Sequence, residues 1–195
     1  MDKSAIILQN INDSIATKNK LLNDKKIATS IEDVANAIIE CYQHDGKVLF
    51  CGNGGSAADA QHLAAELTGR YYYDRPPLYA EALHVNTSYL TAVANDYNYN
   101  EVYARLIKGI GRKGDILIGM STSGNSQNVI GAIHAAKDKG IFTIGLTGSN
   151  GGKMNDLCDI NIAVPSNDTP RIQECHMMIG HAFCQVVETS LFPNK

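Results

Sequence analysis

Residues 51–67, CGNGGSAADAQHLAAEL, combine a glycine-rich turn with a helix that carries His62 and Glu66. Glycines let the backbone approach a ligand closely, and the free amides and positive dipole at the start of a helix attract an anion. Side chains four residues apart lie on one face of a helix, where they can share a metal ion or a proton. We therefore predict an anion site and, roughly 9 Å farther along the helix axis, a site for metal binding or proton transfer.

A second loop with similar chemistry is STSGNS, residues 121–126, which follows the apolar run DILIGM. Its hydroxyl groups donate hydrogen bonds without adding charge, which suits a phosphate monoester on a polyhydroxylated substrate. Lysine is absent from both loops, so the G-x-x-x-x-G-K-[ST] pattern of nucleoside triphosphatases is not met. The hydroxyl-bearing candidates of the two loops are Ser56, Ser121, Thr122, Ser123 and Ser126.

The last predicted helix carries a second stripe of residues beside its apolar face. This mostly uncharged stripe consists of Gln173, Met177, His181, Cys184 and Glu188. Its spacing indicates burial against something other than the main core. Gln173 and His181 are separated by about 12 Å of helix rise, which is awkward for direct ligation of one ion. Unless the helix starts late, we expect two chains to contribute to a composite site.

Each motif also has a simpler interpretation. Gly, Ser and Asn are common in turns, the pair on the first helix can be a solvated ion pair, and a lone helical histidine is most often hydrogen-bonded and half-buried. A dinucleotide site is a further alternative, because Gly52, Gly54 and Ala57 fit G-x-G-x-x-A and Asp74 follows about 20 residues later. That alternative leaves the second loop and the His/Glu pair without a function.

The elements around these motifs alternate between apolar strands and helices. Strands are expected at 47–52, 115–120, 141–148 and 160–166, and helices in the first forty residues, from Ser56 with a capping box to Gly69, and at 100–110, 126–140 and 169–191. The state of residues 78–83 is left open. Nearly continuous apolar strands indicate a parallel sheet covered on both faces. We predict a doubly wound α/β sandwich with an N-terminal helical extension, and both loops at the carboxyl edge of its sheet.

Composition limits the class of protein. The chain has 195 residues, 44% hydrophobic and 19% charged, which suits one globular domain. A net charge of −3 gives no broad basic field for nucleic acid, and no apolar run is long enough for a signal peptide or a membrane span. Five cysteines without a C-x-x-C pair argue against a disulfide frame or a thiolate zinc site. Reduced thiols in the cytoplasm are the expectation.

The segments CGNGGSAADAQHLAAEL, AVANDYNYNEVYARLI, STSGNSQNVI and RIQECH together resemble the sugar isomerase (SIS) family, and specifically its phosphoheptose isomerases. The resemblance covers essentially the whole chain. It implies one SIS domain over 1–195, with helices of 1–40 contributing to oligomerisation and an α/β sandwich over 41–195. It also implies a homotetramer with active sites at subunit interfaces.

The resemblance assigns roles residue by residue. It implies zinc, one ion per subunit, on His62, Glu66, Gln173 and His181. The substrate contacts that it implies are Asn53, Gly54, Gly55, Ser56, Glu66, Asn95, Asp96, Ser121, Thr122, Ser123, Ser126 and Gln173. Glu66 is then the expected catalytic base and His181 the complementary acid or base.

The implied reaction interconverts sedoheptulose 7-phosphate and D-glycero-D-manno-heptose 7-phosphate. It is the first step toward activated heptoses of lipopolysaccharide, capsule or S-layer. The alternative is a non-catalytic SIS protein, either a regulator that binds the replication initiator DnaA or a sugar-phosphate sensor. Such regulators lack the full acid and histidine pair, so the presence of both Glu66 and His181 favours the enzyme.

Overall fold

A five-stranded parallel sheet organises the chain, and the computed structural model describes residues 2–193. The strand order is β2-β1-β3-β4-β5. The strands are β1 (Val48–Gly52), β2 (Ala80–Ala82), β3 (Ile116–Ser121), β4 (Phe142–Thr147) and β5 (Ile160–Ala163). The order reverses direction at β1 and β3, which is the switch point where α/β sheets of this type bind ligands.

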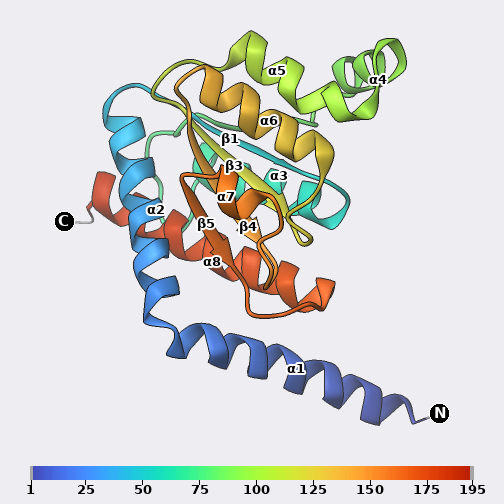
Figure 1. Ribbon diagram of the computed structural model, residues 1–195. Coiled ribbons are helices and arrows are strands. Elements are labelled where there is room, and N and C mark those ends of the chain that lie inside the picture. The colour runs from blue at the N-terminus through green and yellow to red at the C-terminus, as the bar shows by residue number, and fades with distance from the viewer. Residues whose placement is uncertain (1, 194–195) are drawn as a thin grey trace.

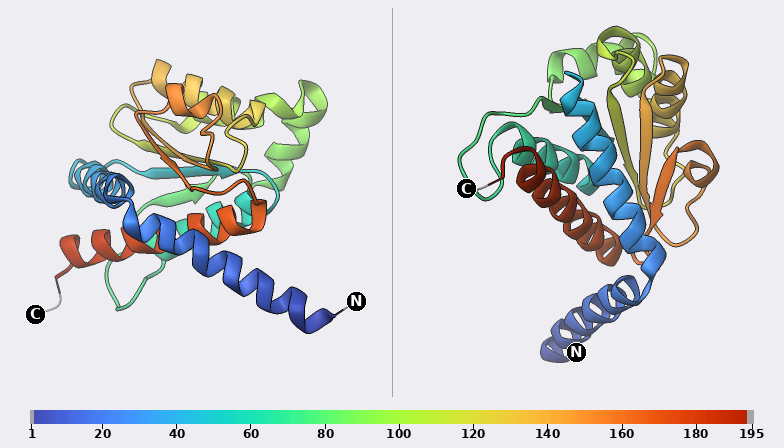
Figure 2. Two further views of the ribbon diagram at one scale, coloured as in Figure 1. Left: turned by 60° about the horizontal axis from the view of Figure 1, so that its bottom comes forward. Right: turned by 90° about the vertical axis from the view of Figure 1, so that its left-hand side faces the viewer.

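Helices cover both faces of the sheet (Figures 1 and 2). The helices are α1 (Lys3–Asn23), α2 (Lys25–Gln43), α3 (Gly55–Thr68), α4 (Thr87–Asp96), η1 (Tyr99–Glu101), α5 (Val102–Ile110), α6 (Gln127–Asp138), α7 (Met154–Leu157) and α8 (Thr169–Leu191). One core lies between the sheet and α2, α3 and α8, and the other between the sheet and α4 to α7. The predicted doubly wound sandwich is therefore confirmed.

Alternating strand residues supply the two cores. Val48 and Phe50 of β1 face the α3 side, whereas Leu49 and Cys51 face the α5 side. Side chains of a strand point alternately to opposite faces, so a strand covered on both sides must be apolar throughout. All five residues of β1 are accordingly buried.

The N-terminal helices differ in their packing. α2 buries Val34, Ala35, Ile38 and Cys41 against the sheet layer, whereas α1 buries Thr17 and Leu21 and extends away from the body (Figure 2). The exposed large apolar residues of α1 are Ile6, Ile7, Leu8, Ile11, Ile15 and Leu22. The two helices that sequence periodicity predicts are thus present, and α2 is part of the sandwich.

Three local features differ from or add to the sequence expectations: one was left open, one was missed and one was wrong. Residues 78–83, whose secondary structure the sequence left undecided, contain the short edge strand β2. Helix α4 was not predicted at all. The expected helix start at Ser56 is wrong: α3 begins at Gly55, with Gly54 as its N-cap at φ +56° and no side-chain cap. Glycine adopts this left-handed backbone without strain, so the chain enters the helix before the serine can cap it.

A buried histidine links α8 to the end of β4. His176 is fully buried, and its Nε2 lies 3.1 Å from the carbonyl oxygen of Thr147. Burial lowers the pKa of His176 to about 4, although the bond to Thr147 acts in the opposite direction. The folded protein therefore holds this imidazole neutral, while the unfolded chain protonates it near its ordinary pKa of 6.5.

This difference predicts a loss of folding stability in mild acid. Since the folded pKa is depressed, the contribution is complete above pH 6.5 and declines as the pH falls toward 4. The free energy of unfolding should fall by about 3 kcal/mol more in the native protein than in His176→Gln over this range. Denaturant titrations at several pH values measure it, and parallel pH profiles for the two proteins would contradict the assignment.

Candidate active site

The two predicted loops lie side by side at the carboxyl edge of the sheet. β1 and β3 are parallel neighbours, with Gly52 opposite Met120. The glycine loop, residues 52–56, and the serine loop, residues 121–126, therefore leave the sheet next to each other. The glycine loop leads directly into α3, and the serine loop leads into α6. This arrangement places two helix N-termini at one edge, as the alternation of strands and helices predicts.

Hydrogen bonds between side-chain amides join the loops. Asn53 Nδ2 donates to Asn128 Oδ1 at 2.8 Å, and Asn128 Nδ2 donates to Asn53 Oδ1 at 2.8 Å. The hydroxyl of Tyr99 also donates to Asn53 Oδ1, at 3.3 Å. Sequence reasoning missed Asn128, which is buried in the first turn of α6. An asparagine within the apolar run NVIGAIHAA is the signal that could have revealed it.

The serine loop presents a small group of hydroxyls. Ser121 Oγ lies 2.9 Å from Ser126 Oγ and 3.4 Å from Ser123 Oγ. Thr122 and Ser123 also line a cavity of about 320 Å³ beside the start of α8. Ser56 of the glycine loop is buried. The serine loop thus presents hydroxyls at the edge where an anion is expected, with both Ser123 and Ser126 within reach of Ser121.

Asn95 and Asp96 lie at the end of α4 and are exposed. Among the described residues, Asn95 Nδ2 donates to Asp96 Oδ1 at 2.9 Å, and neither side chain hydrogen-bonds to a loop. The structure of one chain therefore does not bring this pair into the site. Their assignment stays a prediction from the family resemblance.

The candidate metal ligands and the candidate acid and base converge. His62 Nε2 lies 2.9 Å from Glu66 Oε1, and His181 Nε2 lies 3.4 Å from His62 Nε2. One ligand atom from each of these residues, here called the His–Glu–His cluster, lies within 4.8 Å of the others. The side chain of His62 is 51% exposed and that of Glu66 is 22% exposed, so a ligand can reach the cluster from solvent.

A glycine permits this convergence. A Cβ atom on Gly180 of α8 would lie 2.4 Å from Leu63 Cδ2, closer than atoms can approach. Leu63 is fully buried in α3, so its side chain or one of the helices would have to shift to admit that atom. The absent side chain therefore lets α3 and α8 touch, and the residues next in sequence, His62 and His181, face each other.

Gln173 lies elsewhere along α8. Its side chain packs against Gly55, where an added Cβ would lie 2.5 Å from Gln173 Nε2. α8 is continuous from Thr169 to Leu191, so Gln173 and His181 remain about 12 Å apart along the helix axis. The structure thus places Gln173 beside the glycine loop and His181 beside His62, and a late helix start does not reconcile them.

Tyr71 is a neighbour of the cluster that sequence reasoning missed. Its ring centroid lies 5.7 Å from that of His181. It belongs to the segment between α3 and β2, in the sequence RYYYDRPP. Three adjacent tyrosines gave no signal to distinguish the one that faces the site.

The donor set fits a divalent metal ion. A tetrahedral zinc ion with nitrogen ligands at about 2.05 Å holds those nitrogens about 3.3 Å apart. The two imidazole nitrogens of the cluster are 3.4 Å apart, and a carboxylate oxygen lies 2.9 Å from one of them. Two nitrogens and one oxygen are ligands that zinc accepts.

The dinucleotide alternative loses support from the position of Asp74. This residue is exposed and precedes β2, in the segment that follows α3. The acid of a dinucleotide fold must instead reach the ribose of a cofactor bound at the first glycine turn. In this chain the side chain of Gln173 packs on Gly55 at the same turn.

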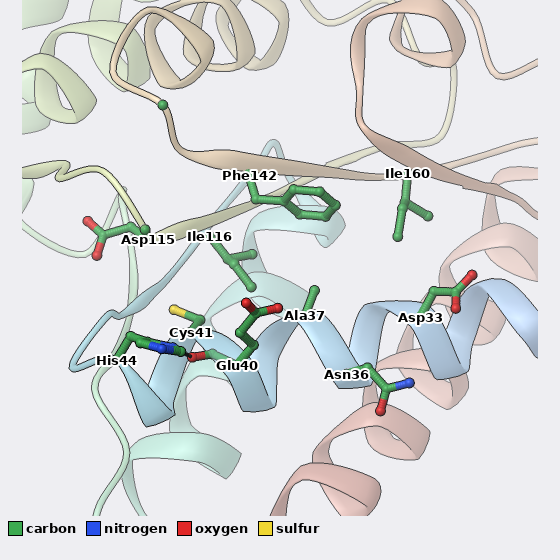
Figure 3. Close-up of a pocket in the computed structure, with 12 residues that line it drawn as sticks. Asp33, Asn36, Ala37, Glu40, Cys41, His44, Asp115, Ile116, Phe142 and Ile160 are labelled. Carbon is green, nitrogen blue, oxygen red and sulfur yellow. Dashed lines mark hydrogen bonds between the residues drawn. The ribbon is translucent and has the colours of Figure 1, made fainter.

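A larger pocket lies at the opposite edge of the sheet and is not the candidate site. Its volume is about 580 Å³, and it lies between α2 and the first residues of β3 and β4, Ile116 and Phe142 (Figure 3). Glu40 and His44 line it, and His44 Nδ1 lies 2.8 Å from the carbonyl oxygen of Glu40. Ligands of α/β sheets bind at the carboxyl edge, where the two loops and the cluster lie.

Comparison with known proteins identifies the family of the chain. A family model described as the SIS domain matches residues 13–148, more than half of the chain. The chain belongs to the SIS-domain family. A phosphoheptose isomerase of Aneurinibacillus thermoaerophilus is 51% identical to it over 189 residues, which is 97% of this chain and 96% of that protein.

Solved structures extend this similarity within the SIS family. A phosphoheptose isomerase of Neisseria gonorrhoeae aligns with a TM-score of 0.91 at 40% identity, over 96% of this chain and all of that one. One from Francisella tularensis aligns with a TM-score of 0.93 at 34% identity, over 97% of this chain and all of that one. The predicted membership of the phosphoheptose isomerase group of the SIS family is thus confirmed.

The role of Gly180 can be tested by adding one methyl group. Gly180→Ala should destabilise the fold by about 1–3 kcal/mol, because Leu63 and the two helices must shift. It should also weaken Zn²⁺ binding, because the same shift separates His181 from His62. Denaturant unfolding and titration with Zn²⁺ measure the two effects.

Gly109→Ala in α5 is the matched control. Nothing lies within 4 Å of a Cβ at that position, so the change should be neutral or slightly stabilising. Native stability and native Zn²⁺ affinity in Gly180→Ala would show that the close helix contact does not organise the cluster.

Proposed function

We propose that this SIS protein is an aldose–ketose isomerase that converts sedoheptulose 7-phosphate to D-glycero-D-manno-heptose 7-phosphate. The observation that carries the proposal is the convergence of Glu66 and His181 in one cluster. Glu66 lies on α3, which begins at the glycine loop, and His181 lies on α8. The whole-length similarity to phosphoheptose isomerases supports the same substrate class.

The spacing along α3 suits a phosphorylated sugar of several carbons. Gly55 and His62 are seven residues apart, which corresponds to roughly 10 Å of helix rise. The loop hydroxyls and amides bind the phosphate at one end of α3. The reactive carbons then lie beside the cluster, so the length of α3 sets the distance between the anion site and the catalytic residues.

Isomerisation moves a proton between two neighbouring carbons and their oxygens. Glu66 is assigned the removal of the proton from carbon, and His181 the exchange of protons with the substrate oxygens. Both groups lie next to His62: its Nε2 is 2.9 Å from Glu66 Oε1 and 3.4 Å from His181 Nε2, so they can act on the same substrate carbons. The ring of Tyr71 lies beside that of His181, with their centroids 5.7 Å apart.

The proposed metal is Zn²⁺, one ion per chain, held by His62, Glu66 and His181. When bound, it supplies Lewis-acid polarisation of the substrate carbonyl. A carboxylate bound to a cation is a weaker base, so removal of the substrate proton by Glu66 requires its release from the ion. Gln173 is proposed as a further ligand and substrate contact. Since Gln173 and His181 of one chain are about 12 Å apart on a continuous helix, a second copy of the chain is the proposed source of the glutamine at each site.

This requirement supports the proposed homotetramer with active sites at subunit interfaces. The exposed apolar face of α1 supports it as well, because isolated helices seldom leave such a face in water. The proposed substrate contacts Asn95 and Asp96 also lie on the exposed surface of the chain, where a neighbouring copy can place them at a site.

The proposed pathway position is the first step toward activated heptoses, in the cytoplasm. Among residues 2–193, none of the helices is long and apolar enough to span a membrane. The five cysteines are all free thiols. Burial raises the pKa of Cys41 to about 11, so this thiol stays protonated and inert.

A non-catalytic regulator of the DnaA-binding type or a sugar-phosphate sensor is the other candidate. Such a protein needs the phosphate loops and has no need of an acid and a histidine in contact. The approach of Glu66 and His181 to a common neighbour favours the isomerase.

Replacement of the proposed base tests the proposal. Glu66→Gln should keep the fold and phosphate binding and lower kcat by at least ~100-fold, because the amide cannot accept the proton. Aldose formation from sedoheptulose 7-phosphate is the measurement. Glu32→Gln, which changes an exposed carboxylate on α2, is the control. Near-native turnover in Glu66→Gln would remove this residue from the mechanism.

Metal content is a separate prediction. The purified protein should carry about one divalent ion per chain. A chelator should abolish turnover, and Zn²⁺ should restore it. His62→Ala should lose the ion, whereas His134→Ala, which removes an exposed histidine of α6, should retain it. Full activity of metal-free protein would refute the role of the ion.

A further inference from the structure

A buried carboxylate from α8 holds the segment that follows α3. Glu188 is fully buried, and its Oε1 accepts a hydrogen bond from the backbone N–H of Tyr71 at 2.8 Å. Its Oε2 accepts one from the backbone N–H of Tyr72 at 2.7 Å. Arg75 completes the arrangement, because its Nε donates to Glu188 Oε1 at 3.1 Å. The carboxylate thus fixes three points of one short segment.

The same arginine binds the end of α3. Arg75 Nη2 donates to the carbonyl oxygen of Glu66 at 2.9 Å, and Nη1 donates to that of Leu67 at 2.8 Å. The last carbonyls of a helix lack partners within the helix and carry its negative dipole, so a guanidinium stabilises them. Arg75 therefore connects α3 to α8 through Glu188, and one of its bonds is to the backbone of Glu66 itself.

The arrangement also positions the ring beside His181. Because Glu188 holds the backbone of Tyr71, it holds the Tyr71 ring 5.7 Å from the His181 ring. The Tyr71 ring therefore forms one wall of the cluster.

The bonds of Arg75 and Glu188 are the contact between α3 and α8 at the end of α3 that carries Glu66. Gln173 packs on Gly55 at the start of α3, and Gly180 packs on Leu63 in its middle. The bonds of Arg75 and Glu188 add a third contact, one turn beyond His62. The second and third contacts lie on either side of Glu66 along α3, so together they constrain the distance between Glu66 and His181.

We propose that Arg75 and Glu188 are positioning residues for the His–Glu–His cluster. The inference rests on the proposed function, since it assigns the pair a role in the same site. A buried ion pair is often no more stabilising than apolar side chains of the same volume, because both charges lose their hydration. The role of this pair is instead to set the position of α3 relative to α8, because its bonds join the two helices that carry the cluster.

Glu188→Gln tests the role with almost no change of shape. The amide nitrogen cannot accept a hydrogen bond, so one backbone N–H loses its partner and Arg75 keeps an uncompensated charge. We expect kcat to fall at least ~10-fold while KM changes less than ~3-fold, and the Kd for Zn²⁺ alone to rise at least ~10-fold. The phosphate loops are far from the change, which is why KM is expected to hold.

Asp115→Asn is the matched control. Asp115 is a buried carboxylate that accepts bonds from two backbone N–H groups, those of Lys47 and Arg112, and from the Lys47 ammonium at 2.6 Å. It therefore resembles Glu188 in chemistry, yet it lies at the opposite edge of the sheet, just before β3 (Figure 3). This variant should lose stability and keep kcat and Zn²⁺ affinity within about 2-fold of native.

Arg75→Lys provides a second test. Its ammonium can pair with Glu188 but cannot also bind both carbonyls of α3, so the same losses are expected to a smaller extent. The proposal is overturned if either folded variant keeps native kcat and Zn²⁺ affinity, or if Asp115→Asn loses them equally. It is also overturned if both variants fail to fold while Asp115→Asn folds, because the pair would then be a requirement of the fold.

The two readouts separate this inference from the proposed function. Titration with Zn²⁺ needs no sugar phosphate, so it reports on the cluster even if the substrate assignment is wrong. A native protein that binds Zn²⁺ and does not convert sedoheptulose 7-phosphate would contradict the proposed function. In that case the Zn²⁺ affinities of the variants still decide whether Arg75 and Glu188 position the cluster.

Discussion

The parallel contact between α3 and α8 determines where the three side chains of the His–Glu–His cluster lie. Gln173 meets Gly55 at the start of α3, Gly180 meets Leu63 in the middle, and Glu188 reaches the end through Arg75. The two helices therefore run in the same direction and touch at three levels. His62 and Glu66 from one helix and His181 from the other lie together because of this alignment.

The sheet supplies the second constraint. Parallel pairing of β1 with β3 brings the glycine and serine loops to one edge, and the reciprocal amide bonds of Asn53 and Asn128 hold them there. The loops offer amides and hydroxyls and no lysine, which suits a phosphate that must leave with the product. The anion site then lies at the start of α3 and the cluster nearer its end, so the rigid helix sets the distance between them.

Sequence was sufficient for the features that depend on local pattern. Apolar strands and helical periodicity predicted the sandwich, and the four-residue spacing of His62 and Glu66 predicted their shared face. Helix α4 was missed because its residues, TSYLTAVAND, include several that favour helices weakly, although Asn86 caps it through the N–H of Tyr89. Strand β2 was hard to predict because it is an edge strand of three residues, too short to show a clear apolar pattern.

Features that depend on contacts distant in sequence could not be predicted in this way. Nothing near Gly180 indicates that Leu63 will pack on it, and Glu188 belongs to a stripe whose partner was unknown. Arg75 lies beside a pair of prolines that signals only a break in structure. The expectation of a composite site came from the distance between Gln173 and His181, and the unbroken α8 preserves that distance.

The account depends on one substrate spanning the loops and the cluster. A crystal structure of Glu66→Gln with sedoheptulose 7-phosphate bound measures this directly. The account predicts the phosphate among the hydroxyls of Ser121, Ser123 and Ser126, and the first two carbons of the sugar between residue 66 and His181. A phosphate bound at the cluster, or a sugar bound away from both, would contradict it.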